Sequence, residues 1–361
     1  MNATELNNQD LKLLCDMGIE VFNPNRNYWL IRTKGGAYFD EFYFKNYIGI
    51  EWDDIIDISI KKLDDMILLV GKKYPHEPRP SYIASQIFKF IHGLKKGDIV
   101  LIPNKDSKII AFGEIVEDEI YVSDDGIDNP LSKITLSEDE EPSIPVLRKR
   151  RKVNWIKHIP RENLDPYLQT FIYAHNTIVD LKSYSLFIDR TLSDFYIKGE
   201  DAYFTLRVNK QSNIPFDDLA DLFVLNRSLC DFINLYLPEY HINRGEIVCK
   251  IDVQSKGPVQ FTGSIKKITI IGLICSTLCG GKVSINWKDG FEMSTDGITK
   301  IVDSMVKAYD VIQTHAETRE NMQMKQDYEN LLTEYKKCQQ HLELSAPDIN
   351  TDITITNIGS N

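Results

Sequence analysis

The chain has 361 residues, of which 42% are apolar and 26% charged, and its formal net charge is −11. This composition is that of a globular protein long enough for two domains, and it excludes a fibrous or wholly disordered chain. The acidic balance argues against a protein that coats nucleic acid nonspecifically, because such binding depends on a broad cationic surface.

The first twenty residues have neither a basic segment nor an apolar one, which predicts a cytoplasmic protein without a secretory signal. The six cysteines form no C-x-x-C pair, so the sequence indicates reduced thiols rather than a disulfide framework or a zinc site. We expect no metal and no cofactor. The cysteines are Cys15, Cys230, Cys249, Cys275, Cys279 and Cys338.

Residues 1–25 predict a short N-terminal helix that ends at Gly18 and packs beside the first domain. Residues 26–52 then predict two strands joined by a hairpin-like excursion that is rich in aromatic residues. Two interpretations of this stretch stay open. Its rings and its arginine could stack a flat ligand, or they could form an ordinary aromatic β-core.

Five further elements follow up to residue 182. Residues 63–70 and 81–91 have apolar residues at helical spacing. Residues 99–102 and 109–116 are apolar runs typical of paired strands, preceded by an expected turn at Gly97 and Asp98. Residues 153–159 predict a last strand in which alternate residues, including Trp155, face the core.

The order of five sequence pieces carries a resemblance. WLIR, GIEW, FKFIHGLKKGDIVLIP, AFGEI and RRKVNWIKHIPR follow one another within residues 26–182. This order resembles the PUA-like or EVE-like domain that precedes the nuclease in some Mrr-type, modification-dependent restriction proteins. The resemblance implies a small β-barrel with flanking helices that holds a modified base in an aromatic cleft.

The resemblance also implies a set of base-binding residues. Pocket walls and groups that recognise the base edge correspond to Trp29, Arg32, Trp52, Ser85 and Gln86. A side-chain amide presents a donor and an acceptor together, which suits a base edge. For Trp29 a place in the core is the alternative interpretation.

One dense cationic run is the candidate for phosphate contacts. Arg148, Lys149, Arg150 and Arg151 follow the acidic residues 137–141. Either the cations contact phosphates beside the base pocket, or the two segments are surface stretches that partly neutralise one another.

The second half predicts a connecting segment at 183–200 and an α+β domain at 201–296. Within that domain the run 268–278 is too short to cross a bilayer and predicts a buried helix, with a membrane-touching segment as the alternative. The other expected elements are strands at 202–208 and 247–253, a helix at 215–238 and a closing hairpin at 283–293.

Residues 297–344 predict a long helix with a coiled-coil-like end, and residues 345–361 have no visible reason to fold. The second apolar run of this helix is expected to project and to mediate self-association, because an apolar seam of that length should not stay in water. The run consists of Met324, Tyr328, Leu331, Tyr335, Cys338 and Leu342.

A restriction relative should be searched for a nuclease core. Gln254 and Lys256 form a Gln-x-Lys pair at a strand end, but the upstream acidic loop that would complete a Mg²⁺ site is missing. The sequence also lacks a P-loop, a G-x-S-x-G elbow and an H-E-x-x-H motif.

The sequence therefore predicts an α+β protein whose first domain is a non-enzymatic reader or sensor. Its expected partner is a nucleic acid or nucleotide with a modified base, in a bacterial restriction or anti-phage context. Two alternatives remain: a divergent Mg²⁺-dependent, modification-specific endonuclease, and an oligomeric scaffold protein. The sequence does not distinguish DNA from RNA or identify the base.

Overall fold

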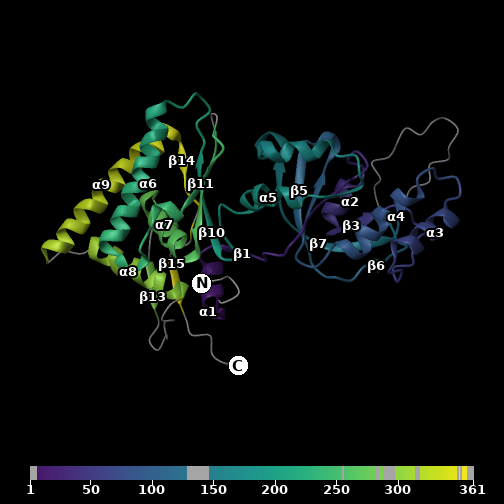
Figure 1. Ribbon diagram of the computed structural model, residues 1–361, viewed down its shortest axis with the longest axis horizontal. Coiled ribbons are helices and arrows are strands. Elements are labelled where there is room, and N and C mark those ends of the chain that lie inside the picture. The colour runs from purple at the N-terminus through teal and green to yellow at the C-terminus, as the bar shows by residue number, and fades with distance from the viewer. Residues whose placement is uncertain are drawn as a thin grey trace. The chain divides into compact units, whose positions relative to one another are not determined.

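A computed structural model describes residues 6–127, 146–253, 256–280, 284–287, 297–313, 318–347, 349 and 352–355. The fold is α+β, as predicted, and the chain forms two compact units (Figure 1). We call Asn25–Leu192 the central unit. Met1–Pro24 together with Ser193–Asn361 form the terminal unit.

Seven strands of the central unit form a curled half-barrel sheet. Neighbouring strands are antiparallel, except that β2 and β4 run parallel. In spatial order the strands are β3 (Tyr47–Ile50), β7 (Lys149–Pro160), β5 (Ile109–Ile115), β4 (Ile99–Pro103), β2 (Tyr28–Ile31) and β8 (Ile178–Asp180), with β6 (Tyr121–Val122) paired to β7.

The helices of the central unit pack around this sheet. They are α2 (Phe39–Phe44), α3 (Leu63–Lys73), α4 (Pro80–Phe88), the π-helix η2 (Lys89–Gly93) and α5 (Ser185–Leu192), with short 3₁₀ turns η3 (Lys105–Ser107), η4 (Arg161–Asn163), η5 (Pro166–Tyr173) and η6 (Lys182–Tyr184). The helices predicted at 63–70 and 81–91 and the strands at 99–102 and 109–116 are confirmed.

The hairpin-like excursion predicted within residues 26–52 is wrong. The aromatic segment forms the helix α2, and the strands on either side of it do not pair with each other: β2 pairs with β4 and β8, and β3 pairs with β7. Gly36 permits this path, because its φ is +98° and a Cβ there would lie 2.2 Å from the main-chain nitrogen of Lys105.

The terminal unit is built on a six-stranded sheet. Its spatial order is β1 (Glu20–Phe22), β9 (Phe195–Lys198), β10 (Asp201–Val208), β12 (Gly257–Ser264) and β11 (Val248–Ile251), with β14 (Leu344–Ser345) also paired to β10. Its helices are α1 (Asn8–Asp16), α6 (Phe216–Tyr236), α7 (Ile265–Leu278), α8 (Ile298–Gln313) and α9 (Arg319–Leu342), with 3₁₀ turns η7 (Pro238–Tyr240) and η8 (Arg244–Glu246).

The structure corrects the predicted position of the N-terminal helix. β1 pairs in parallel with β9, and Asp10 on α1 accepts a hydrogen bond from the main-chain nitrogen of Thr299 over 3.2 Å. Figure 1 shows the purple α1 and β1 beside the green elements of the terminal unit. The chain therefore begins in the terminal unit, passes through the central unit and returns.

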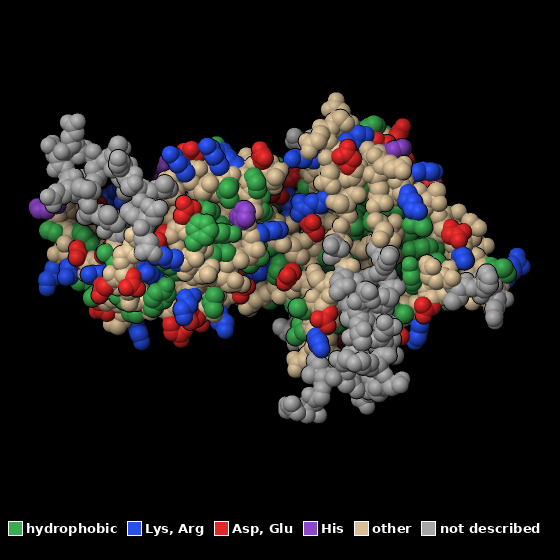
Figure 2. Space-filling model, turned by 180° about the vertical axis from the view of Figure 1, so that it is seen from behind, with side chains coloured by type: hydrophobic (Ala, Val, Ile, Leu, Met, Phe, Trp, Pro, Cys, Tyr) green, Lys and Arg blue, Asp and Glu red, His purple; other side chains and the backbone are tan. Residues whose placement is uncertain are grey.

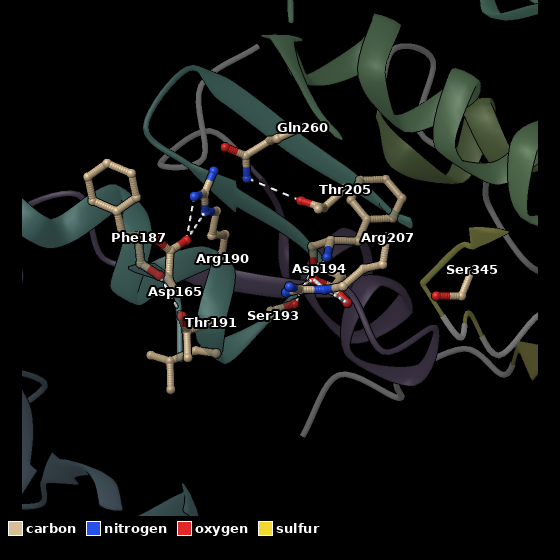
Figure 3. A network of polar contacts seen from close by, with 12 residues as sticks. Asp165, Phe187, Arg190, Thr191, Ser193, Asp194, Thr205, Arg207, Gln260 and Ser345 are labelled. Atoms are coloured by element: carbon tan, nitrogen blue, oxygen red, sulfur yellow. Dashed lines mark hydrogen bonds and ion pairs between the residues drawn. The ribbon is translucent and has the colours of Figure 1, made fainter. Parts of the chain in front are cut away.

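The predicted connecting segment 183–200 is divided between the units. Arg190 on α5 donates through Nε to Asp165 over 2.8 Å, within the central unit (Figure 3). Arg207 on β10 donates through Nε to Asp194 over 2.9 Å, within the terminal unit (Figure 3). The first ion pair is buried, whereas the side chains of the second are about one third exposed.

The run predicted as a buried helix at 268–278 is confirmed as part of α7, and its side chains from Ile268 to Leu278 are buried in the terminal unit. In the part of the chain that the structure describes, no helix is both long and apolar enough to cross a membrane.

The predicted projecting helix is wrong. α8 and α9 are separate helices, and the seam of α9 is buried against its own chain. The Tyr335 hydroxyl, for example, donates to Asn226 on α6 over 3.1 Å. The apolar seam therefore has a partner within the chain, and it no longer supports self-association, which stays an untested prediction.

The end of the chain also differs from the prediction in part. β13 (Ser284–Trp287) pairs in parallel with β15 (Asp352–Ile355), so the tail predicted at 345–361 contributes strands. The proposed partner strand of the closing hairpin, within 288–293, lies outside the described residues, as do the acidic residues 137–141.

Candidate functional site

Trp29 lies in the core, as the alternative interpretation predicts, and not in the wall of a base pocket. Its side chain is 8% exposed, and its indole nitrogen donates to Asp98 Oδ2 over 2.9 Å. The same carboxylate also accepts bonds from the main-chain nitrogens of Asn27 and Lys95. Trp29 therefore cannot form a wall of an open pocket. The turn predicted at Gly97 and Asp98 is confirmed, because Gly97 has a φ of +83°.

Gln86 also has a structural contact. It is 2% exposed, and its amide oxygen accepts a hydrogen bond from the main-chain nitrogen of Ile178 over 2.8 Å. One turn earlier on α4, the Tyr82 hydroxyl accepts a bond from the nitrogen of Thr177 over 3.2 Å. These bonds fasten α4 to the start of β8, so the prediction that the Gln86 amide oxygen reads a base edge is wrong.

The ends of β2 and β3 lie together. The Lys34 ammonium, after β2, is 3.0 Å from a carboxylate oxygen of Glu51, after β3. The Tyr38 hydroxyl donates to the same carboxylate. Directly after β2, the main-chain nitrogen of Arg32 donates to the oxygen of Thr177, directly before β8, over 2.9 Å. These contacts gather both strand ends and the base of β8 in one region.

Trp52 lies at this strand end with an unusual backbone. Its φ is +65°, a left-handed conformation that costs a bulky residue energy and persists only where the surroundings enforce it. Its half-buried side chain packs against the sheet core and against the cluster formed with α3 and α4. Two of the predicted base-binding residues are aromatic: Trp29 is buried in the core, whereas Trp52 is only half buried.

Two neighbours hold the Trp52 backbone in place. The ammonium of Lys149 donates to the Trp52 carbonyl oxygen over 2.8 Å. The carboxylate of Asp53 accepts hydrogen bonds from three consecutive main-chain nitrogens, at residues 146, 147 and 148, over 2.8, 3.2 and 2.7 Å. Burial lowers the pKa of Lys149 to about 8, and the negative charge of Asp53 partly opposes that effect.

We call this region the strand-end site. It combines an aromatic ring, two cationic side chains, a carboxylate and hydroxyl groups around the ends of β2 and β3 and the first turns of α4. Ser85 is a half-buried residue of α4 next to Gln86, and it is included because the resemblance implies it. The site comprises Arg32, Lys34, Tyr38, Glu51, Trp52, Tyr82 and Ser85.

The predicted phosphate contacts of the basic run are wrong for three of its four residues. Arg151 is 1% exposed and donates to the carbonyl oxygens of Phe90 and Ile91, at 2.9 and 2.7 Å. Arg150 is 5% exposed and donates through Nε to the Leu147 oxygen over 2.9 Å. Lys149 is likewise buried. These cations are bonded to main-chain carbonyls because the run forms the beginning of β7.

Arg148 is the exception in this run. Its side chain is 36% exposed and pairs with Asp124 over 2.8 Å. On the face drawn in Figure 2, blue and red side chains are interspersed rather than gathered into one cationic field. This face therefore has no single cationic field, and the acidic composition of the chain argues against nonspecific coating of nucleic acid.

The structure also reveals an exposed aromatic group that the sequence did not single out. The rings of Phe39 and Tyr43 on α2 are stacked, with centroids 5.7 Å apart, and Trp155 lies 5.8 Å from Tyr43. Phe44 is 75% exposed, and the Tyr43 hydroxyl is 3.1 Å from His158 Nδ1. We call these five residues the α2–β7 aromatic cluster.

A local irregularity of the sheet positions Trp155 in this cluster. The register of β5 and β7 shifts between Phe112 and Gly113, so that Ile156 is an extra residue in β7. A Cβ at Gly113 would lie 2.6 Å from the Trp155 ring. The helical spacing of Phe39 and Tyr43 is the sequence signal for this cluster, whereas the sequence analysis predicts a hairpin-like excursion there.

The nuclease alternative gains nothing from the described residues. Gln254 lies outside them, and Lys256 is exposed directly before β12. Within the described ranges, no three His, Cys, Asp or Glu residues are grouped so that they could hold a metal ion.

Comparison with known proteins adds one finding. Residues 28–182 match a protein-family model described as "Domain of unknown function (DUF8426)". The matched segment lies within the central unit. No curated protein matches the chain.

Proposed function

We propose that the central unit is a non-enzymatic reader or sensor that binds a nucleobase, in a nucleic acid or a nucleotide, at the strand-end site. The observation that carries this proposal is the left-handed backbone of Trp52, which Lys149 and Asp53 maintain. Strain held by surrounding contacts is concentrated at functional sites of proteins. Here its effect is to fix an indole ring at the end of β3.

The chemistry of the site suits a base. An indole ring stacks on any nucleobase, and a guanidinium such as that of Arg32 can cover a ring or bind a phosphate. Lys34 and Glu51 supply a cation and an acceptor at the same strand ends. The hydroxyl of Ser85 on α4 is the candidate for recognising the base edge.

The preference for a modified base, the bacterial defence context and a cytoplasmic location are part of the proposal. They are supported by the resemblance of residues 26–182 to PUA-like and EVE-like domains. The endonuclease alternative has no described metal site in its favour.

The test is a fluorescence-anisotropy titration of labelled single-stranded oligonucleotides. The oligonucleotides carry cytosine, methylcytosine or hydroxymethylcytosine at one position, and each is titrated at two salt concentrations. Loss of the Trp52 ring should cost about 1–3 kcal/mol of binding free energy, which is roughly a 5- to 150-fold loss of affinity. Both Trp52→Ala and Trp52→Gly are measured, because glycine accepts the left-handed backbone without strain.

Two control variants locate the effect. Phe216 on α6 is 85% exposed and lies in the terminal unit, so Phe216→Ala should bind like the parent protein. Phe44→Ala removes the most exposed ring of the α2–β7 aromatic cluster. If Phe44→Ala abolishes binding while both folded Trp52 variants bind normally, the strand-end site is not the base-binding site.

A further inference from the structure

A groove runs between α6 and α9 on the terminal unit. The two helices lie side by side in Figure 1. They are antiparallel, because Tyr236 contacts Asp327 at one end and Asn226 contacts Tyr335 at the other. The groove has a cavity volume of about 370 Å³. Its lining extends from Leu225 to Tyr236 on α6, which is roughly 16 Å at the helical rise per residue.

The apolar residues of the groove repeat as a helical seam. On α6 the apolar lining residues Leu225, Phe232 and Leu235, together with the polar Ser228, follow a three-four-three spacing. On α9 the central apolar residue is Leu331. Leu235 is 65% exposed, although its spacing places it on the seam. This spacing is the one by which a further helix packs into the space between two others.

The walls of this groove are acidic. Asp231, Asp327 and Glu334 line it, and among the described residues that line it there is no lysine or arginine. Asp327 is bonded to the Tyr236 hydroxyl over 2.7 Å and to the Gln323 amide over 3.0 Å, two neutral groups that leave its charge in place.

The other two carboxylates have cationic neighbours at the surface. Asp231 pairs with Arg244, and Glu334 pairs with Lys337, but all four side chains are about half exposed. Such surface pairs contribute little and can exchange with an incoming cation. The groove therefore offers an apolar floor between carboxylates.

We propose that this groove is a docking site for an amphipathic helix of a partner protein that carries lysine or arginine beside an apolar seam. Helix-in-groove recognition uses apolar anchors at such spacing, and opposite charges on the rim fix the register and partner choice. A second copy of this chain fits poorly, because an isologous contact would oppose the carboxylates of both groove walls.

The probe is a fluorescein-labelled peptide of leucine and lysine, about three helical turns long, with leucine at the seam positions. Two peptides serve as controls: a leucine–lysine peptide of the same composition in scrambled order, and a peptide with glutamate in place of lysine. Anisotropy is measured with the full-length protein. The seam peptide should bind, and each control peptide should bind at least about tenfold more weakly.

Variants of the protein locate the binding. Leu235→Glu should weaken binding of the seam peptide at least about tenfold, because it places a charge on the apolar anchor position. Phe216→Glu, at the start of the same helix, changes an exposed residue outside the groove and should have no effect beyond about twofold. Asp327→Asn should weaken binding and reduce its dependence on salt.

Three results would overturn the proposal. One is equal binding of the seam and scrambled peptides, and another is unchanged binding by a folded Leu235→Glu protein. The third is a dimer in light scattering that Leu235→Glu dissociates, which would make a second copy the occupant. None of these results bears on base binding by the central unit, which is tested separately.

Discussion

The Lys149 ammonium donates a hydrogen bond to the main-chain carbonyl of Trp52 over 2.8 Å. The bond joins the first residue of β7 to the end of β3. Because the ammonium is buried, it cannot exchange this carbonyl for water. Lys149 is thus a positioning residue for the Trp52 ring.

The buried ammonium predicts a specific dependence of stability on pH. Burial lowers the pKa of Lys149 from 10.5 to about 8, so between these values the unfolded chain holds a proton that the folded chain has released. The contribution of Lys149 to the free energy of unfolding should therefore rise with pH between about 8 and 10.5 and stay constant below about 8, where both states hold the proton.

The measurement compares the parent protein with Lys149→Met by denaturant unfolding at several pH values from 7 to 10. Three of the four tryptophans lie in the central unit, so tryptophan fluorescence reports mainly on that unit. The difference in free energy of unfolding between the two proteins should grow by up to about 1.4 kcal/mol for each pH unit above 8. A constant difference would contradict a buried, titrating Lys149.

Asp98 should be essential for the stability of the central unit. Its carboxylate accepts bonds from Trp29 Nε1 and from the main-chain nitrogens of Asn27 and Lys95, at 2.9, 2.8 and 2.9 Å. Asp98→Ala leaves these donors without their acceptor and should lower the free energy of unfolding by at least about 3 kcal/mol. Asp40→Ala, at an exposed position of α2, is the matched control, and equal unfolding midpoints for the two variants would contradict the assignment.

The basic run should divide sharply between structural and surface residues. Arg151→Met removes the donors to the Phe90 and Ile91 carbonyls and should destabilise the central unit by at least about 3 kcal/mol. Arg148→Ala removes an exposed ion pair with Asp124 and should change the free energy of unfolding by less than about 1 kcal/mol. If urea unfolding shows the two variants equally stable, the bonds from Arg151 to the carbonyls of η2 do not stabilise the central unit.

The α9 seam should stabilise the terminal unit rather than an oligomer. Tyr335 is fully buried, and Tyr335→Ala should lower the free energy of unfolding by about 3–5 kcal/mol. Its exposed neighbour supplies the control variant Lys336→Ala. Circular dichroism and light scattering are measured on the same samples. A folded Tyr335→Ala protein with a reduced oligomeric mass would show that α9 instead contacts another copy.

Elements with strong local periodicity were predictable from the sequence. Their apolar residues lie at a spacing, or in a run, that indicates one type of element. This group consists of helices α3, α4 and α7 and strands β4 and β5. The segment Phe39–Phe44 was not predictable in the same way, because aromatic residues favour strands and its helix is fixed by tertiary packing.

The candidate site was predictable only in part. The resemblance implies a site with Arg32, Trp52 and Ser85; in the structure Arg32 follows β2, Trp52 follows β3 and Ser85 lies on α4, and their shared role stays a prediction. The sequence does not show that Gln86 accepts a bond from Ile178 or that Arg151 donates to Phe90. Both contacts join residues far apart in the sequence, so they depend on the tertiary fold. Lys149, Arg150 and Arg151 lie within the strand β7, which explains why they face inward rather than toward a phosphate.

The central claim is that Trp52 stacks on a base, and a photo-crosslink tests it most directly. A single-stranded oligonucleotide with one 5-iodocytosine, a 5-substituted cytosine, is irradiated with the full-length protein, and the crosslinked residue is identified by mass spectrometry. The account predicts a crosslink at Trp52 that is lost in Trp52→Gly and competed by unlabelled methylcytosine oligonucleotide. A crosslink at Tyr43 or Phe44 would contradict it. So would a result in which the competitor removes no crosslink.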